Sequence, residues 1–170
     1  MLSKAMEKAL NDQINKEVYS EYFYYAMAAY LFSVNLDGFA NFFLVQSQEE
    51  HDHVMKFFNY INDRGGRVRV KGIDEPKNEY ESPQQVFELA LKHEQYVSKS
   101  INEIMDLAIQ EKDHAAKVFL QWFVDEQVEE EASMDKILNR IKLIGGEGHG
   151  LLMIDSELAK RVFTPSAAGN

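Results

Sequence analysis

The sequence predicts an all-α protein: a four-helix bundle with antiparallel neighbours, a long crossover between the second and third helices, and a short C-terminal fifth helix. Three observations indicate this fold. Only three prolines occur, and the glycines gather between long stretches without helix breakers. Within these stretches apolar residues recur at steps of three and four, the spacing of one helix face. The links between stretches are short, except for the long one over residues 65–82.

The first two predicted helices precede this long link. The first spans about residues 3–36, with a stripe at positions 10, 14, 17, 21, 24, 28 and 31. The second begins after Asp37-Gly38 and is closed by Gly65-Gly66, because paired glycines favour a helix end. Both stripes are apolar at their ends and polar near their middles.

The third and fourth predicted helices follow the long link. Ser82-Pro83-Gln84-Gln85 combines an N-cap serine, a proline at the first helical position and a glutamine three residues after the cap, which indicates a helix start. The fourth helix starts at Asp113 and ends before Gly145-Gly146. Their stripes are also interrupted by polar residues mid-helix, and a short apolar segment over residues 150–163 predicts the fifth helix.

The long link decides the topology. Eighteen residues extend up to about 60 Å, whereas a 28-residue helix is about 42 Å long. Residues 65–82 can therefore run the length of the bundle, which permits the second and third helices to be parallel. We expect residues 1–170 to form a single domain, with the bundle over about 3–145 and the fifth helix over about 150–163.

Composition excludes several functional classes. No cysteine is present, which excludes disulfides, zinc-thiolate sites and thiol catalysis and is compatible with a reducing compartment. The N-terminal residues lack the apolar core of a signal peptide, and no apolar run approaches the roughly 18 residues that span a bilayer. The formal net charge of −10 argues against nucleic-acid partners. We therefore expect a cytoplasmic protein with no membrane and no nucleic-acid partner.

All four apolar stripes are interrupted near their middles by residues that can ligate a metal ion. These are Glu17 from the first helix, Glu50 and His53 from the second, Glu94 from the third, and Gln127 and Glu130 from the fourth. Ionised carboxylates in a bundle core are disfavoured unless cations pair with them, and two divalent ions would satisfy this set. Glu50 and His53 are three residues apart and can reach one ion. Oxygen-rich ligation suits iron or manganese.

Three neighbouring acids could form an accessory cation site. Glu126 and Glu129 lie one residue beside the fourth stripe, and Glu49 has the same relation to Glu50. In these positions they could face a cavity instead of the core, whereas Asp125 belongs to the solvated side of a charge run.

The aromatic and histidine residues are mostly interpreted as packing or solvent-facing. Tyr24 is distinguished by its position, because it lies seven residues after Glu17 on the same face, where its hydroxyl could hydrogen-bond a ligand or donate one electron. Trp122 neighbours the fourth stripe, where packing is favoured over electron donation. The remaining histidines are expected to face solvent or to support a ligand: His51, His93, His114 and His149.

At these residues the sequence resembles the non-haem ferritins of bacteria and archaea. The resemblance covers essentially the whole chain, from Ala9-Leu10-Asn11-Asp12-Gln13 through Gln48-Glu49-Glu50 and His53 to Glu126-Gln127-Val128-Glu129-Glu130-Glu131. It implies a ferritin-like domain and a hollow shell of 24 subunits. It also implies three iron sites: one at Glu17, Glu50 and His53, a second at Glu94 and Glu130 with Glu50 bridging and Gln127 beside it, and a third at Glu49, Glu126 and Glu129.

The sequence also departs from related patterns. Bacterioferritins and many di-iron oxidases carry a second Glu-x-x-His on the fourth helix, where this chain has Gln127-Val128-Glu129-Glu130. Bacterioferritins carry a haem-binding methionine directly after the second helix's glutamate, where this chain has His51, so we expect no haem. Glu21 stands where the resemblance implies a small residue, one turn from Glu17, and could add a cation ligand or reach the cavity.

The resemblance and the ligand pattern together predict an iron-storage protein with ferroxidase activity. It would bind two Fe(II) ions per subunit within the bundle, pass one electron from each to O2, and store Fe(III) as mineral inside the shell. An alternative enzyme is a di-iron oxidase or peroxidase of the rubrerythrin or manganese-catalase kind, which usually needs two histidines or a redox partner module. A non-catalytic shell or scaffold with structural ions is the other alternative.

Overall fold

Five helices form the regular structure of the protein. The computed structural model describes residues 1–146 and 148–165, and this part of the chain contains no strand. The helices are, in chain order, α1 Lys4–Ser33, α2 Asp37–Asp63, α3 Pro83–Gln110, α4 His114–Leu143 and α5 Gly148–Leu158. The predicted all-α fold is therefore confirmed. Among the described residues, no helix combines the length and apolarity needed to cross a membrane.

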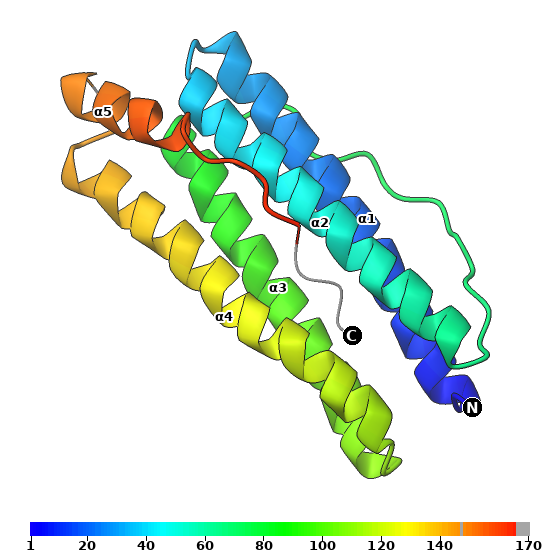
Figure 1. The fold of residues 1–170 in the computed structure, drawn as a ribbon. Helices are drawn as coiled ribbons and strands as arrows, with labels where there is room; N and C mark the ends of the chain where they lie inside the picture. Colours follow the sequence, from blue (N-terminus) through cyan, green and yellow to red (C-terminus); the bar gives the residue numbers. More distant parts are fainter. Residues whose placement is uncertain (147, 166–170) are drawn as a thin grey trace.

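The four long helices pack as two antiparallel pairs, α1 with α2 and α3 with α4 (Figure 1). Each pair is closed by a link of three residues, 34–36 and 111–113. Both links contain one residue with a positive φ, Asn35 at 60° and Lys112 at 55°, which reverses the chain sharply at the helix end. The two pairs face each other, and α1 also contacts α3 across the bundle.

Three of the long helices begin with a side-chain cap. The Ser3 hydroxyl accepts from the backbone N–H of Met6 at 3.0 Å, and the Asp113 carboxylate accepts from that of Ala116 at 3.0 Å. The predicted start of α3 is confirmed, because the Ser82 hydroxyl accepts from the backbone N–H of Gln85 at 3.2 Å. These caps satisfy backbone donors that have no partner within the helix.

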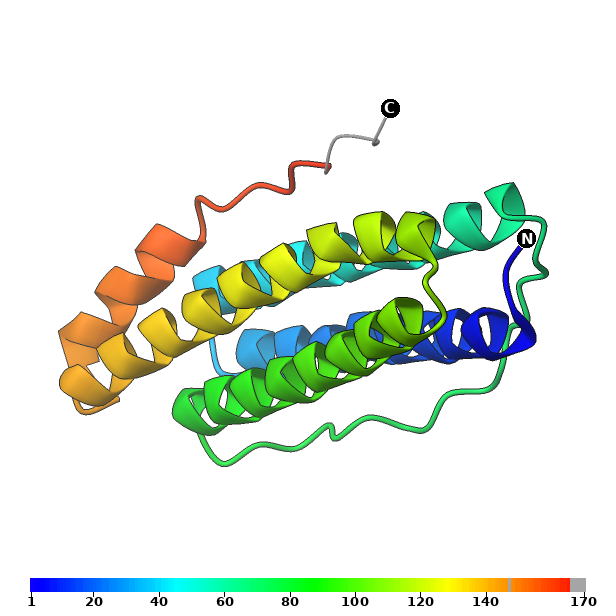
Figure 2. The ribbon, with the colours of Figure 1, turned by 90° about the horizontal axis from the view of Figure 1, so that it is seen from below.

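The long crossover runs along the bundle beside α1 and α3 (Figure 2). It returns the chain to the end where α2 began, so α2 and α3 are parallel, as predicted from its length. Asn11 on α1 holds its first part: its amide donates to the carbonyl of Arg67 at 3.1 Å and accepts from the N–H of Arg69 at 2.6 Å. Near its end, the ring of Tyr80 packs on Tyr30 with centroids 5.2 Å apart.

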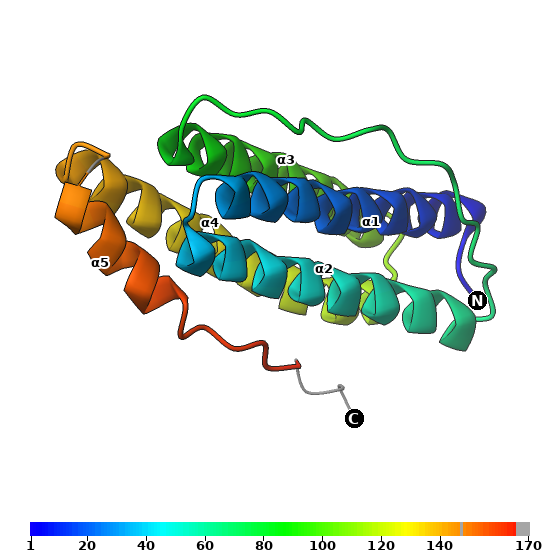
Figure 3. The ribbon, with the colours of Figure 1, turned by 90° about the horizontal axis from the view of Figure 1, so that it is seen from above.

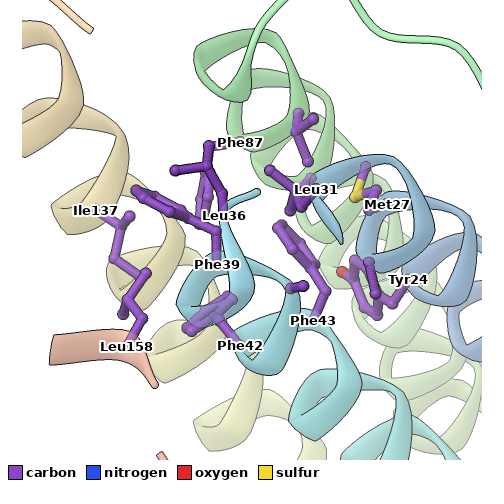
Figure 4. Close-up of a cluster of buried hydrophobic side chains, with 14 of the residues drawn as sticks. Tyr24, Met27, Leu31, Leu36, Phe39, Phe42, Phe43, Phe87, Ile137 and Leu158 are labelled. Carbon is purple, nitrogen blue, oxygen red and sulfur yellow. The ribbon is translucent and has the colours of Figure 1, made fainter. Parts of the chain in front are cut away.

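The apolar core is divided into two clusters, one toward each end of the bundle. The α5-end cluster draws on all five helices and contains Tyr24, Met27, Leu31, Phe39, Phe43, Phe87, Ile137 and Leu158, among others (Figure 4). The opposite-end cluster contains Met6, Leu10, Ile14, Phe57, Ile61, Val97, Ile101, Leu120 and Phe123, among others. Buried polar residues occupy the levels between them on every long helix.

The short α5 lies across one end of the bundle, over the start of α2 (Figures 1 and 3). The Asp155 carboxylate accepts from the backbone N–H of Phe39 at 2.9 Å, which supplies the cap that α2 lacks on its own preceding residue. A Cβ at Gly38 would overlap the backbone carbonyl of Asp155. Glycine at this position therefore allows α5 to approach the backbone of α2 directly.

The fifth helix ends at Leu158, earlier than the predicted end at residue 163. The Asn41 amide on α2 donates to the carbonyl of Leu158 at 3.1 Å and to that of Arg161 at 3.0 Å. These carbonyls are therefore bonded to α2 instead of continuing the helix, and the chain turns back along α2 (Figure 3). Nothing within α5 itself indicates this end, because the partner lies more than a hundred residues earlier.

Replacing Gly38 with alanine should destabilise the contact between α5 and α2. The added methyl group must displace the backbone of Asp155, and forcing extra volume into a packed contact costs about 1–3 kcal/mol. Chemical denaturation measures the loss in unfolding free energy. Gly72→Ala is the matched control, because nothing lies within 4 Å of a Cβ at that position. Equal stabilities for the two variants would contradict the close approach.

Candidate metal centre

The residues predicted as ligands of the two core ions lie, together with Gln46, between the two apolar clusters. We call this set the polar layer: Glu17, Gln46, Glu50, His53, Glu94, Gln127 and Glu130, each at most 5% exposed. Every long helix contributes to it, because the helices place their polar residues at matching depth. Four carboxyl groups and one imidazole are thereby removed from water, which is costly unless cations or protons neutralise them.

One half of the layer groups three ligand atoms around a common point. Glu17, Glu50 and His53 each offer one ligand atom, and these atoms all lie within 4.8 Å of one another. The distance between His53 Nδ1 and Glu50 Oε2 is 3.3 Å. Two carboxylate oxygens, Glu17 Oε2 and Glu50 Oε2, are buried without a hydrogen-bond partner. Lone pairs that converge without donors are what a metal ion requires of its ligands.

In the other half of the layer, hydrogen-bond donors occupy the carboxyl groups. The Tyr24 hydroxyl donates to Glu94 Oε1, and Gln127 Nε2 donates to Glu94 Oε2 at 3.0 Å. Gln46 Nε2 donates to Glu130 Oε2 at 2.7 Å. Gln127, predicted beside the second ion, and Tyr24, predicted to hydrogen-bond a ligand, are thus both brought to Glu94. Each oxygen of Glu94 therefore accepts a hydrogen bond, which fixes the orientation of this carboxyl group.

Burial and mutual repulsion keep protons on the layer. Burial raises the pKa of Glu50 well above its usual range, and the nearby Glu94 and Glu17 raise it further. Burial raises the pKa of Glu94 to about 7, against hydrogen bonds from Tyr24 and Gln127. Burial, followed by the charge of Glu94, raises the pKa of Glu130 to about 8. A cation that enters the layer must therefore displace protons.

The structure shows ligand-supporting residues that were not predicted. Gln13, fully buried on α1, donates from Nε2 to Glu17 Oε1 at 2.7 Å. Gln46 belongs to the predicted stripe but was given no role, and it holds Glu130. One sequence signal could have found both residues: a glutamine on the core face four residues before a predicted ligand glutamate. Gln13 stands in this relation to Glu17, and Gln46 stands in it to Glu50. Which oxygen each amide would meet depends on helix packing.

The predicted accessory acids are not brought together as a compact site. Within the described part of the chain, the one group of acids and histidines close enough to hold an ion is Glu17, Glu50 and His53. Glu49 and Glu126 are half-buried, whereas Glu129 is exposed. Glu49 instead forms a two-pronged ion pair with Arg161, at 3.0 and 2.7 Å.

The remaining histidines and Glu21 lie outside the layer. His51 is exposed, and its Nδ1 lies 3.4 Å from Glu21 Oε2, so Glu21 points along the α1–α2 surface instead of toward Glu17. His93 is half-buried and its Nε2 lies 2.8 Å from the Ser20 hydroxyl, where burial lowers its pKa to about 4. His114 and His149 are exposed, as expected.

Trp122 packs against the layer. Its ring is half-buried and meets the ring of His53 edge-on at 5.4 Å between centroids. The Lys56 ammonium lies 4.6 Å from the centroid of the indole. Trp122 therefore covers the outer side of His53, which agrees with the predicted packing role.

Without metal ions, the unfolding free energy should fall as pH rises from about 6.5 to about 8. The unfolded chain has ionised carboxyls there, while folded Glu94 and Glu130 still hold protons because their pKa values are raised to about 7 and about 8. The folded state thus binds more protons, and raising the pH removes stability. His93 acts oppositely, but only below its unfolded value of 6.5.

Denaturation in the presence of a chelator at several pH values measures this dependence. The double variant Glu94→Gln/Glu130→Gln should lose less stability than the parent over the same window, because Glu94 and Glu130 no longer titrate there and only the contribution of Glu50, whose pKa is also raised, remains. A parent protein that gains stability from pH 6.5 to 8 would contradict protonated carboxyls in the layer.

Comparisons with known proteins agree with this arrangement. The ferritin-like domain family matches residues 7–144. A bacterial non-heme ferritin of Staphylococcus aureus is 42% identical over 163 residues, covering 96% of this chain and 98% of its own. An engineered closed form of the Archaeoglobus fulgidus ferritin is 48% identical with a TM-score of 0.95, covering 96% of this chain and all of that one. The open pore ferritin from the same archaeon has a TM-score of 0.94 at 48% identity, covering 95% of this chain and all of its own. By family match, sequence identity and fold, the chain belongs to the ferritin family.

Proposed function

We propose that the protein stores iron: it binds two Fe(II) ions in the polar layer, oxidises them with O2, and retains Fe(III) as mineral inside a shell of its own copies. The observation that carries this proposal is the buried layer itself, with carboxylates from four helices and two oxygens, Glu17 Oε2 and Glu50 Oε2, that lack any partner. Membership of the ferritin family supports iron as the cargo. Oxygen-rich ligation with one imidazole suits this metal.

The two halves of the layer divide the binding of the two ions. Glu17, Glu50 and His53 would hold the first ion, since their ligand atoms already converge. Glu94 and Glu130 would hold the second, with Glu50 between the two. Each oxygen of Glu94 accepts a hydrogen bond from Tyr24 or Gln127 and keeps a further lone pair with which it would bind the second ion.

Side chains of the layer would then release protons and donate electrons during the reaction. Two Fe(II) ions supply one electron each, which reduces one O2 by two electrons. The carboxyls of Glu94 and Glu130, with pKa values raised to about 7 and about 8, release protons as the ions bind. The Tyr24 hydroxyl, hydrogen-bonded to Glu94, would supply one further electron only where O2 is reduced beyond the two-electron level. Anionic ligands favour Fe(III) over Fe(II), which promotes oxidation in the layer.

Storage requires enclosure, and the net charge of −10 would help to concentrate cations. We infer a homo-oligomeric shell of 24 subunits. Glu49, Glu126 and Glu129 would pass Fe(III) from the layer to the interior as a third iron site. The Arg161 guanidinium neutralises Glu49, so a cation at this site must compete with it.

Replacing Glu50 or His53 with alanine should abolish fast aerobic Fe(II) oxidation without unfolding the shell. Each change removes a ligand from the group that binds the first ion. Stopped-flow absorbance of Fe(III) formation measures the rate. Glu21→Ala is the control, because Glu21 lies on the same face of α1, reaches His51 on the surface, and should oxidise at the parent rate. Parent-like rates for Glu50→Ala and His53→Ala would sink the assignment.

Electron microscopy of the purified protein after aerobic Fe(II) addition separates storage from the alternatives. Hollow particles with dense cores are expected. Empty particles would indicate a scaffold, and small dimers that turn over O2 would indicate an oxidase of another kind.

Replacing Arg161 with glutamine should strengthen divalent-cation binding at the accessory acids several-fold, because Glu49 loses its resident counter-ion. Calorimetric titration with Mn2+ measures the sites that fill after the first two. Arg140→Gln is the control, since Arg140 forms a similar two-pronged pair with Glu157, away from these acids. Identical weak-site affinities for both variants would exclude Glu49 as a ligand.

A further inference from the structure

A chain of hydrogen bonds connects a lysine at the surface to a proposed metal ligand. Lys16 Nζ donates to the Ser100 hydroxyl, Ser100 donates to Gln13 Oε1 at 2.6 Å, and Gln13 Nε2 donates to Glu17 Oε1 at 2.7 Å. Gln13 and Ser100 are buried, at 0% and 4% exposure. The chain spans α1 and α3 and ends on the carboxylate whose other oxygen is unpartnered.

The two ends of this chain determine the direction of its bonds, because Lys16 can only donate and the Glu17 carboxylate can only accept. An ammonium group has donors and no acceptor, so the Ser100 oxygen must accept from Lys16. The Ser100 proton then goes to the remaining acceptor, the Gln13 carbonyl oxygen. That choice turns the Gln13 amide nitrogen toward Glu17. Without Lys16, the Ser100 hydroxyl could rotate away from Gln13 Oε1, and the Gln13 amide would lose the donor that holds its carbonyl end.

The orientation matters because Glu17 has two chemically distinct oxygens here. Oε1 is held by Gln13, whereas Oε2 is buried with no hydrogen-bond partner beside Glu50 and His53. A donor on one oxygen restricts the rotation of the carboxylate, which leaves the other oxygen to a metal ion.

Lys16 is itself held in place. Its ammonium lies 5.3 Å from the centroid of the Tyr96 ring on α3, a cation–π contact that keeps it directed toward that helix. In sequence Lys16 looks like an ordinary surface residue beside Glu17, and nothing in the spacing connects it to Ser100.

We propose that Lys16, Ser100 and Gln13 are positioning residues that fix the rotation of the Glu17 carboxylate and direct its Oε2 at the first metal ion. This rests on the proposed function only in taking Glu17 as a ligand. The charge of Lys16 alone would weaken metal binding, because an ammonium group repels a cation. Through the hydrogen-bonded chain, we expect Lys16 to increase the affinity of the site instead.

Anaerobic Co2+ titration tests the proposal, with affinity from calorimetry and ligand geometry from the Co2+ absorption spectrum. Gln13→Leu, Ser100→Ala and Lys16→Met should each weaken the tightest Co2+ site about tenfold and alter its spectrum. Losing a residue that hydrogen-bonds a metal ligand typically lowers metal affinity by about this factor. The Gln13→Leu/Lys16→Met double variant should be no weaker than Gln13→Leu alone, because both act through one bond to Glu17. Lys99→Met is the matched control: it removes an exposed lysine beside Ser100 and should bind as the parent does.

The outcomes separate this proposal from the proposed function. Tighter Co2+ binding in Lys16→Met, or additive losses in the double variant, would overturn the positioning role. Parent-like Co2+ binding in both Lys16→Met and Ser100→Ala would also overturn the positioning role. If Glu17→Ala nevertheless lost the Co2+ site, the assignment of Glu17 as a metal ligand would still hold. If Glu17→Ala also kept parent-like Co2+ binding and Fe(II) oxidation, the proposed ligand assignment itself would fail. Should Gln13→Leu not fold, Gln13→Met keeps the shape and tests the same bond.

Discussion

Carboxylates cannot leave water for a bundle core without counter-charges or protons, and this protein places four of them at the middle of its long helices. The rest of the structure is arranged around that layer. The apolar core is split into two clusters, and each cluster contains residues from all four long helices. Apolar packing therefore holds the bundle together on both sides of the polar layer, whose burial is unfavourable. Raised pKa values at Glu50, Glu94 and Glu130 are the direct consequence of the same burial.

Neutral hydrogen-bond donors lower the free-energy cost of burying the carboxyl groups and leave room for metal ions. Gln13, Gln46, Gln127 and Tyr24 each direct one hydrogen-bond donor at a carboxyl oxygen, and none of them carries a positive charge that would compete with a metal ion. Their distribution is unequal. Glu17 keeps one oxygen open, whereas both oxygens of Glu94 are engaged. Before any ion binds, the two halves of the proposed centre therefore differ in how many ligand oxygens already accept hydrogen bonds.

Segments outside the bundle reach toward the layer from its surface. α5 caps the start of α2 through Asp155 and needs Gly38 beneath it, and the residues after α5 follow α2 to bring Arg161 onto Glu49. The ion pair is only half-buried, so its contribution to stability is modest. Its greater effect is electrostatic, since it sets a positive charge beside an acid that was predicted to bind cations.

The sequence by itself determined the helices, their order, the lengthwise crossover and the burial of the residues predicted as ligands of two ions, because helix periodicity and matching depth are local properties of the chain. It predicted Glu17, Glu50 and His53, which the structure groups together, and it left their roles as ligands to be tested. The tertiary structure decided the partners: Gln13 on Glu17, Ser100 on Gln13, Gln46 on Glu130, Arg161 on Glu49, and Asn41 at the end of α5. Each of these contacts joins different helices or chain ends, or depends on which rotamer the packing selects. Spacing along one helix specifies a face, whereas the atom that a side chain meets is set by the helix packed against it.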